Sequence, residues 1–237
     1  MKNYIKATLI FIFAFATFGC SRSNDLAMFR GNLERTGFYN SEEKSPSGQL
    51  DWKFKADYEW LSSPAISQGI VFINGAGGYL YAVDANSGER RWVFNREKWV
   101  GSSPATINDV VYVGGLDHFL YAVNAKTGSE KWRFETGDMI LSSPAVSDGV
   151  VFFGSYDGHL YALDVDTGQE QWKFKTQGLE TPFSRSAAPE YDILGAIVSS
   201  PAISKGIVYF GSFDGNLYAL EAKTGIEKWR FNTGVGL

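Results

Sequence analysis

The sequence predicts an all-β fold built from a repeated four-stranded unit, and three observations support this prediction. The motif Ser-Ser-Pro-Ala begins at Ser62, Ser102, Ser142 and Ser199, so the chain repeats itself in steps of 40, 40 and 57 residues. Each repeat contains short apolar runs separated by glycine-containing turns, a pattern typical of strands. Beyond the first twenty residues, no stretch keeps the 3.6-residue period of a helix. A period of about 40 residues with four strands is typical of one β-propeller blade.

The third repeat, SSPAVSDGVVFFGSYDGHLYALDVDTGQEQW, indicates how the four strands follow one another. Ser-Ser-Pro-Ala starts the first strand, and GVVFFGS forms the second. Asp157-Gly158 is a strong hairpin signal because both residues can take positive φ, and it leads into HLYALDV. The turn DVDTG then precedes an aromatic fourth strand, QWKF. By analogy, we expect blades at about 59–95, 99–135, 139–175 and 196–232.

An additional piece, LDWKF around Trp52, matches only the fourth strand of a repeat. The fold prediction is therefore a propeller domain over 51–237, with four full blades plus an orphan N-terminal strand in a ring that can be incomplete. Three arrangements are open at this point. The chain is a fragment of a longer propeller, two copies complete one ring, or Trp52 packs against the last blade in a compact four-blade ring. The first two leave blade flanks exposed in a single copy.

Each repeat closes with a tryptophan, and a turn glycine stands four residues before it. A large ring on an outer strand can stack on the neighbouring blade and bury about 150–250 Å². We therefore expect these tryptophans to be core residues rather than a sugar-binding platform. The residues expected to serve in structural docking are Trp52, Trp92, Trp132, Trp172, Trp229, Gly88, Gly128, Gly168 and Gly225.

The residues around these tryptophans carry a family resemblance. The sequence pattern Ala-x-Asp-x-x-(Ser/Thr)-Gly-x-x-x-Trp begins at Ala82 and at Ala162. It resembles the docking motif of the pyrroloquinoline-quinone-type (PQQ-like) propeller repeat. Two further copies carry Asn124 and Glu221 in place of the aspartate, and MFRGNLERTGFY from Met28 resembles the lead-in segment of such proteins. The resemblance implies a β-propeller. It leaves the function open, because the family includes both enzymes and scaffolds.

The amino terminus indicates export to the cell envelope. Lys2 and Lys6 precede the apolar run ATLIFIFAFATFG, which is placed as a signal peptide over residues 1–19 would be. The following TFGC resembles a bacterial lipobox, although Thr17 stands where leucine is usual. We therefore expect lipidation at Cys20, with an outer-membrane anchor on the periplasmic side; a plain secreted protein and an uncleaved anchor are the alternatives.

Residues 20–50 are expected to form a tether and lead-in segment. Cys20 is the only cysteine of the chain, so no disulfide within the chain is expected and packing alone must hold the fold.

Composition and motifs argue against several functions. The formal net charge of −4 and the lack of a basic patch argue against nucleic-acid binding. The dehydrogenases of the resembled family hold their quinone between a tryptophan and a disulfide of adjacent cysteines, above a calcium ion, and one cysteine cannot supply that disulfide. His118 and His159 fall in turns without a ligand cluster. We therefore expect no enzyme activity, no catalytic residue, no cofactor and no metal site.

The connections between blades are the candidate partner-binding region. Trp60 and Trp99 lie off the repeating positions, just before Ser-Ser-Pro-Ala, and Met139 is near the equivalent place in the third repeat. The 57-residue step places an insertion at about 177–195, on the same propeller face, and function concentrates in loops on rigid scaffolds. The insertion supplies the candidate contacts Phe183, Arg185 and Tyr191. Alternatively, the aromatic residues only close the channel mouth and the insertion has no function.

The leading hypothesis is a lipid-anchored scaffold that binds an envelope protein. Repeat type and leader resemble those of lipoprotein subunits of the outer-membrane β-barrel assembly machinery, which implies docking on its barrel-inserting subunit. The first alternative is a module that binds a glycan or a small molecule in a surface or sensory system. A degenerate quinoprotein dehydrogenase is a more distant alternative.

Overall fold

The computed structural model describes residues 49–56, 62–96, 102–178 and 195–234. These ranges contain sixteen strands, and no helix within them is long and apolar enough to span a membrane. The strands form four separate four-stranded antiparallel sheets, each made of strands that are consecutive in the chain. This arrangement confirms the predicted all-β fold of four-stranded propeller blades.

The strands of the four sheets have closely similar lengths. The first sheet contains β1 (Ala65–Ser67), β2 (Ile70–Gly75), β3 (Tyr79–Asp84) and β4 (Arg90–Asn95). The second contains β5 (Ala105–Ile107), β6 (Val110–Gly114), β7 (Phe119–Asn124) and β8 (Glu130–Glu135). The third contains β9 (Ala145–Ser147), β10 (Val150–Gly154), β11 (His159–Asp164) and β12 (Glu170–Lys175). The fourth contains β13 (Ala202–Ser204), β14 (Ile207–Gly211), β15 (Asn216–Glu221) and β16 (Glu227–Asn232).

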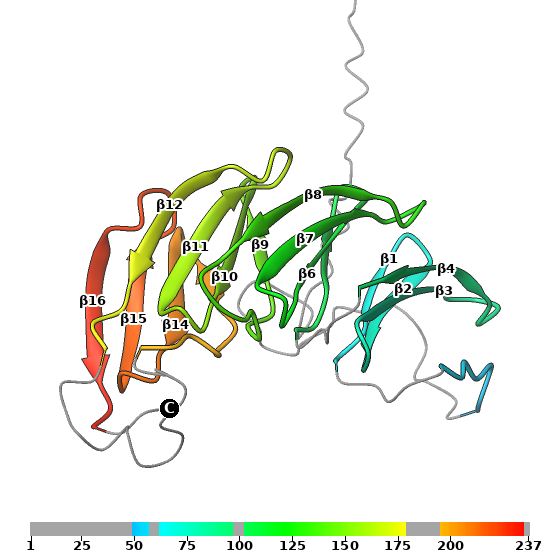
Figure 1. The fold of residues 1–237 in the computed structure, drawn as a ribbon, viewed down its shortest axis with the longest axis horizontal. Coiled ribbons are helices and arrows are strands. Elements are labelled where there is room, and N and C mark those ends of the chain that lie inside the picture. Colours follow the sequence, from blue (N-terminus) through cyan, green and yellow to red (C-terminus); the bar gives the residue numbers. More distant parts are fainter. Residues whose placement is uncertain (1–48, 57–61, 97–101, 179–194, 235–237) are drawn as a thin grey trace, which may run out of the picture.

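The sheets follow one another in chain order across the molecule, and the first and last lie at opposite ends of Figure 1. The short first strands contact each other in the order β1, β5, β9 and β13. The second serine of each Ser-Ser-Pro-Ala links these strands, since the backbone N–H of Ser103 donates to Oγ of Ser143 at 2.9 Å and that of Ser143 donates to Oγ of Ser200 at 3.0 Å. The repeated serines therefore join neighbouring sheets.

The apolar core lies between the sheets. Every residue of β6 and β10 is buried, because the second and third sheets have a neighbour on each side. One cluster shows this clearly: Tyr112 and Leu120 of the second sheet pack with Val151 and Phe153 of the third. The outer strands β4, β8 and β12 alternate between exposed and half-buried residues, so the core is densest near the inner strands.

Three of the docking tryptophans, Trp92, Trp132 and Trp172, each join their sheet to the next one by two contacts. Nε1 of Trp132 on β8 donates to the carbonyl of Val165 at 3.1 Å, and its ring covers Gly168 so closely that a Cβ there would lie 2.7 Å from Cδ2. Gly168 has a φ of +71°, which favours glycine. Two further rings contact the glycine of the following sheet in the same way, Trp92 on Gly128 and Trp172 on Gly225.

The segment around Trp52 docks on the first sheet. Nε1 of Trp52 donates to the carbonyl of Ala85 at 2.9 Å, its ring covers Gly88, and Phe54 meets Tyr81 edge to face. The compact ring with Trp52 on the last blade is therefore wrong. The expected outer strand around Trp52 is also wrong, because residues 49–56 form no strand. Within the described ranges, no other strand of the same blade lies beside this segment.

The expectation that all five docking tryptophans are core residues is wrong for Trp229 and too strong for the other four. Trp52, Trp92, Trp132 and Trp172 are half-buried, since they lie at the outer edge of the packed region. Trp229 is 45% exposed, and Phe231 beside it is 63% exposed. No described sheet follows β16, so no glycine-containing turn covers this side of the fourth sheet in the described ranges.

The substitution Gly168→Ala tests the docking contact. Gly149→Ala is its matched control, because Gly149 has a similar φ of +77° but open space where a Cβ would lie. The control should lose only about 1 kcal/mol of unfolding free energy for a residue forced to positive φ. Gly168→Ala should lose about 3 kcal/mol, since the methyl group also displaces Trp132. Urea denaturation measures both values, and equal losses would contradict the role of the ring contact.

Candidate protein-binding face

In each sheet, one turn joins the second strand to the third, and a connection leads from the fourth strand to the next sheet. Because adjacent strands are antiparallel, these turns and connections lie at the same end of the sheets. Hydrogen bonds join the two kinds of segment. The backbone N–H of Tyr156 donates to the carbonyl of Met139 at 2.9 Å, and that of Phe213 donates to the carbonyl of Ala196 at 3.0 Å. We call the surface formed by these turns and connections the connection face.

Most of the residues expected to bind a partner lie outside the described ranges. Met139 is described and half-buried on the connection face, next to the fully buried Ile140. The expected lipidation site also falls in a part of the chain that the structure does not describe. The residues outside the described ranges are Cys20, Trp60, Trp99, Phe183, Arg185 and Tyr191.

The connection face contains apolar residues that the sequence analysis missed. Leu116, Tyr156 and Phe213 occupy equivalent places in the turns of three successive sheets, and each is half-buried. Burial and the nearby charge of Asp138 raise the pKa of Tyr156. An apolar residue inside the turns GGLDH, GSYDG and GSFDG was an available signal, because polar residues and glycine dominate turns. Partly exposed aromatic residues of this kind are common in protein interfaces.

An aspartate in the third-sheet turn holds its part of the connection face rigid. Oδ2 of Asp157 accepts hydrogen bonds from the hydroxyl of Tyr161 at 2.6 Å and from the backbone N–H of Gly137 at 2.8 Å. Oδ1 accepts the backbone N–H of His159 at 2.9 Å, and Nδ1 of the same histidine lies 3.2 Å away. This aspartate therefore joins its own sheet to the preceding connection.

The fourth sheet repeats this arrangement with a more deeply buried carboxylate. Asp214 accepts hydrogen bonds from the hydroxyl of Tyr218 at 2.5 Å and from the backbone N–H of Gln177 at 3.1 Å. The turn geometry differs from the expected one: Gly158 and Gly215 have positive φ, but neither preceding aspartate does. Among the described residues, no group of three or more His, Cys, Asp or Glu side chains could hold a metal ion.

Arg96 breaks the repeat at the connection that follows the first sheet. A threonine occupies this position after the other three sheets; the Thr136 hydroxyl, for example, donates to the carbonyl of His118 at 2.8 Å. The Arg96 guanidinium instead lies over the Phe94 and Tyr121 rings, and its side chain is only 8% exposed.

The hydrogen-bonding needs of Arg96 are poorly met. Among the described residues, its Nε and Nη2 have no hydrogen-bond partner, and Nη2 lies 3.8 Å from Oε2 of Glu130. Burial lowers the pKa of Arg96 to about 8, whereas the charges of Asp117 and Glu130 oppose this shift. A buried charge without good hydrogen bonds destabilises a fold, so this arginine is costly for stability.

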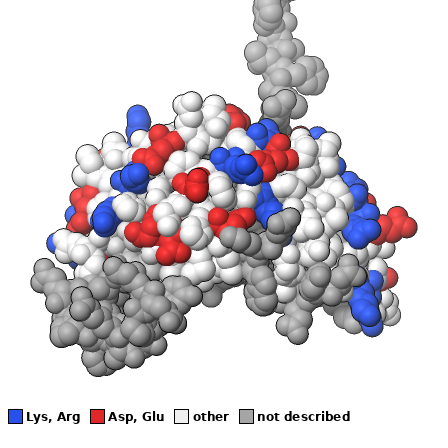
Figure 2. All heavy atoms as spheres, in the orientation of Figure 1, with Lys and Arg blue, Asp and Glu red and all other residues white. Residues whose placement is uncertain are grey.

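Charge does not concentrate in a single-sign region on the face of the molecule seen in Figure 2. Acidic and basic side chains are interspersed there. Ion pairs also form within outer strands, such as Glu130 with Arg133 on β8 and Glu170 with Lys173 on β12. Exposed pairs of this kind contribute little to stability.

The substitution Tyr218→Phe should give a stability difference that depends on pH. At pH 7 it should cost about 1 kcal/mol, because Asp214 loses a buried hydrogen bond. Burial, and then the hydrogen bond to Asp214, raise the pKa of Tyr218 to about 12. The unfolded tyrosine loses its proton near pH 10, so the wild type should lose stability from pH 10 to 12 while the variant is spared this loss. Urea denaturation from pH 7 to 12 measures this, and a constant difference would contradict it.

The substitution Arg96→Thr should stabilise the protein by about 1 kcal/mol, because it removes a poorly partnered buried charge and restores the threonine of the other repeats. Thr136→Ala provides the opposite control and should destabilise by about the same amount. Thermal unfolding compares the three proteins. A loss of stability in Arg96→Thr would mean that the arginine is held by interactions that outweigh its desolvation.

Solved structures share this fold at low sequence identity. BamB from Moraxella catarrhalis is 23% identical with a TM-score of 0.67, over 77% of this chain and 56% of that one. A quinohemoprotein alcohol dehydrogenase from Pseudomonas putida HK5 is 22% identical with a TM-score of 0.73, over 89% of this chain and 40% of that one. A europium-containing methanol dehydrogenase is 16% identical with a TM-score of 0.72, over 86% of this chain and 48% of that one. This chain thus spans only about half the length of these proteins or less.

No curated protein sequence matches the chain. A family profile does match, over residues 43–107 and 95–234, which is most of the sequence. That profile describes outer membrane protein assembly factor BamB. The chain therefore belongs to the family of PQQ-like repeat propellers that includes the outer membrane protein assembly factor BamB.

Proposed function

We propose that this chain is a non-catalytic, lipid-anchored scaffold on the periplasmic side of the outer membrane, where it binds the barrel assembly machinery through its connection face. Family membership supports a role in protein interaction. The dehydrogenases among the similar structures share the fold, so the residues of the chain itself must decide between scaffold and enzyme.

The residues present do not fit a quinone site of the kind described for the resembled dehydrogenases. That site needs a disulfide between adjacent cysteines, and the sequence holds one cysteine, Cys20. It also needs a calcium ion held by acidic and amide side chains, whereas no group of three or more acidic, histidine or cysteine side chains in the described ranges could hold a metal ion, and several described aspartates bond the backbone of their own turns. For example, Oδ1 of Asp164 accepts the backbone N–H groups of Asp166 and Thr167.

The observation that carries the proposal is the row of half-buried apolar residues on the connection face. Leu116, Met139, Tyr156 and Phe213 come from successive turns and one connection. Backbone hydrogen bonds and the aspartate contacts fix these segments, so a partner would bind a surface that is already ordered. Preorganisation lowers the entropic cost of binding, and central aromatic residues carry most of the energy in many interfaces.

The double substitution Tyr156→Asp with Phe213→Asp tests the face. Val93→Asp is the control, because Val93 is an exposed apolar residue, 39% accessible, on the outer strand β4. Surface plasmon resonance with the purified barrel-inserting subunit should show at least about tenfold weaker binding for the double variant, since two central contacts are lost. The control should bind as the wild type does. Equal binding by all three proteins, or none by the wild type, would overturn the proposed face.

Two further measurements address the other parts of the proposal. Mass spectrometry of the mature amino terminus should find cleavage before Cys20 and a lipid on its sulfur, and an unmodified or uncleaved cysteine would refute the anchor. Dye-reduction assays with added quinone and calcium should find no turnover of alcohols or sugars. A turnover of about 1 per second or more would refute the non-catalytic role.

A further inference from the structure

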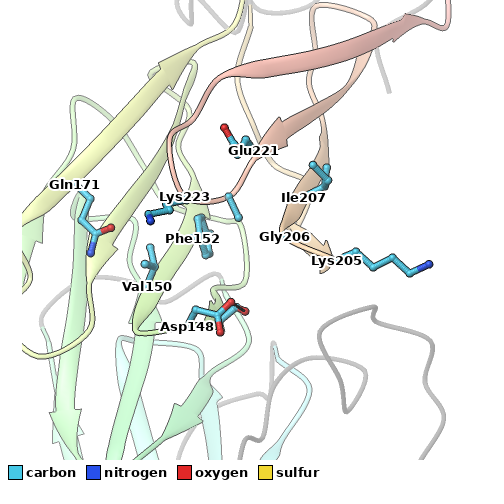
Figure 3. A pocket seen from close by; sticks show the side chains of 11 residues that line it. Asp148, Val150, Phe152, Gln171, Lys205, Gly206, Ile207, Glu221 and Lys223 are labelled. Carbon is cyan, nitrogen blue, oxygen red and sulfur yellow. Dashed lines mark hydrogen bonds between the residues drawn. The ribbon is translucent and has the colours of Figure 1, made fainter.

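A pocket of about 560 Å³ lies between the third and fourth sheets, at the end opposite the connection face. It opens between the turns that follow β9, β13 and β15, and Figure 3 shows side chains from both sheets around it. Its apolar wall consists of Val150, Phe152, Ile207 and Ala222. This volume lies within the range of small-molecule sites, which combine apolar walls with a few polar groups.

The residues beside this pocket match those between the first and second sheets, where the repeat places Phe72 and Ala125, and differ from those between the second and third. At the equivalent place between the second and third sheets, the hydroxyl of Tyr112 donates to the carbonyl of Val165 at 3.0 Å and fills the gap. The repeat places Phe152 and Ala222 at these two positions between the third and fourth sheets. The phenyl ring lacks the hydroxyl and alanine lacks the valine methyl groups, so the space beside the Ala222 carbonyl is less filled.

Lys223 lies at the mouth of the pocket, where the position equivalent to Asp109 is glycine, as it also is at Gly69 and Gly149. In the second sheet, Nζ of Lys126 donates to Asp109 at 2.7 Å. Lys223 takes the place of Lys126 in the fourth sheet, but Gly206 takes the place of Asp109. The same backbone hydrogen bond occurs in both sheets: the N–H of Ala125 donates to the carbonyl of Asp109, and the N–H of Ala222 donates to the carbonyl of Gly206, each at 2.8 Å. Within the described ranges Lys223 forms no ion pair.

The other charged groups at the pocket have interactions of their own or point away from it. Asp148 accepts a hydrogen bond from Ser147, and Glu221 accepts one from Thr224 and pairs with Lys228 at 3.7 Å. The charge of Glu221 also acts on Lys223. Lys205 points away from the pocket in Figure 3. The lining residues thus carry two carboxylates, Asp148 and Glu221, and two ammonium groups, Lys205 and Lys223. Because Glu221 also pairs with Lys228, Lys223 is the ammonium group best placed to attract an anion in the pocket.

We propose that this pocket binds a small amphipathic monocarboxylate. Its aromatic or aliphatic group would lie against Phe152, Val150 and Ile207, and its carboxylate would pair with Nζ of Lys223. The apolar wall selects the hydrocarbon part, and the unpaired ammonium selects the charge, in a partly enclosed site where such a pair is stronger than in water. This site is separate from the connection face and does not depend on the proposed scaffold function.

Isothermal titration of the full chain with 3-phenylpropionate tests the proposal. The wild type should bind saturably, with a dissociation constant below about 10 mM. 3-Phenylpropanol lacks the charge and acetate lacks the ring, so each should bind at least about tenfold more weakly. Lys223→Gln removes the ammonium and should weaken binding of 3-phenylpropionate to the same degree.

Gly206→Asp is the sharpest variant, because it gives Lys223 the partner that Lys126 already has. Asp109 adopts a φ of 62° at the equivalent place, and a Cβ on Gly206 would meet nothing within 4 Å, so the aspartate fits the turn. It should weaken binding at least about tenfold. Lys126→Gln, the matched control in the second sheet, should bind as the wild type does. No saturable binding by the wild type, equal binding of the alcohol, or unchanged binding in both Lys223→Gln and Gly206→Asp would overturn the proposal.

Discussion

The docking of one tryptophan on one glycine of the next sheet is the contact on which the rest of this structure depends. Each four-stranded sheet is too small to bury its apolar residues alone, so it needs a neighbour on both sides. The tryptophan fixes how closely two sheets approach, because its Nε1 bonds a carbonyl of the neighbouring turn and its ring leaves no room for a Cβ at the glycine. Trp229, which makes no such contact with any residue that the structure describes, is 45% exposed.

A regular repeat makes its exceptions informative. Thr136 and Thr176 close their connections with hydroxyl hydrogen bonds, whereas Arg96 places a charge between aromatic rings at the equivalent position. Asp109 pairs with Lys126 in the second sheet, whereas glycine takes the place of this aspartate in the other three sheets and leaves Lys223 without that partner. The regular positions hold the scaffold together, so positions that depart from them without an evident gain in stability are the first places to search for binding.

The two ends of the sheets differ in what they present to a ligand. The connection face carries half-buried apolar side chains on turns that hydrogen bonds hold in place, which suits a broad contact with a protein. The opposite end carries a pocket with an apolar wall and a lysine at its mouth, which suits a small molecule. One scaffold can support both, because rigid sheets separate the two sets of turns.

The sequence by itself determined the number of full sheets, the order of their strands and the identity of the docking residues, because the spacing of Ser-Ser-Pro-Ala, glycine and tryptophan is local and repeats. It could not determine burial, which depends on what lies beside a residue in space. Trp172 and Trp229 share one motif, yet within the described ranges only Trp172 is covered by a following sheet. Only the tertiary structure brought Leu116, Tyr156 and Phe213 to one face, and only it revealed the pocket beside Lys223. Both arise from contacts between sheets, whose residues lie far apart in the chain.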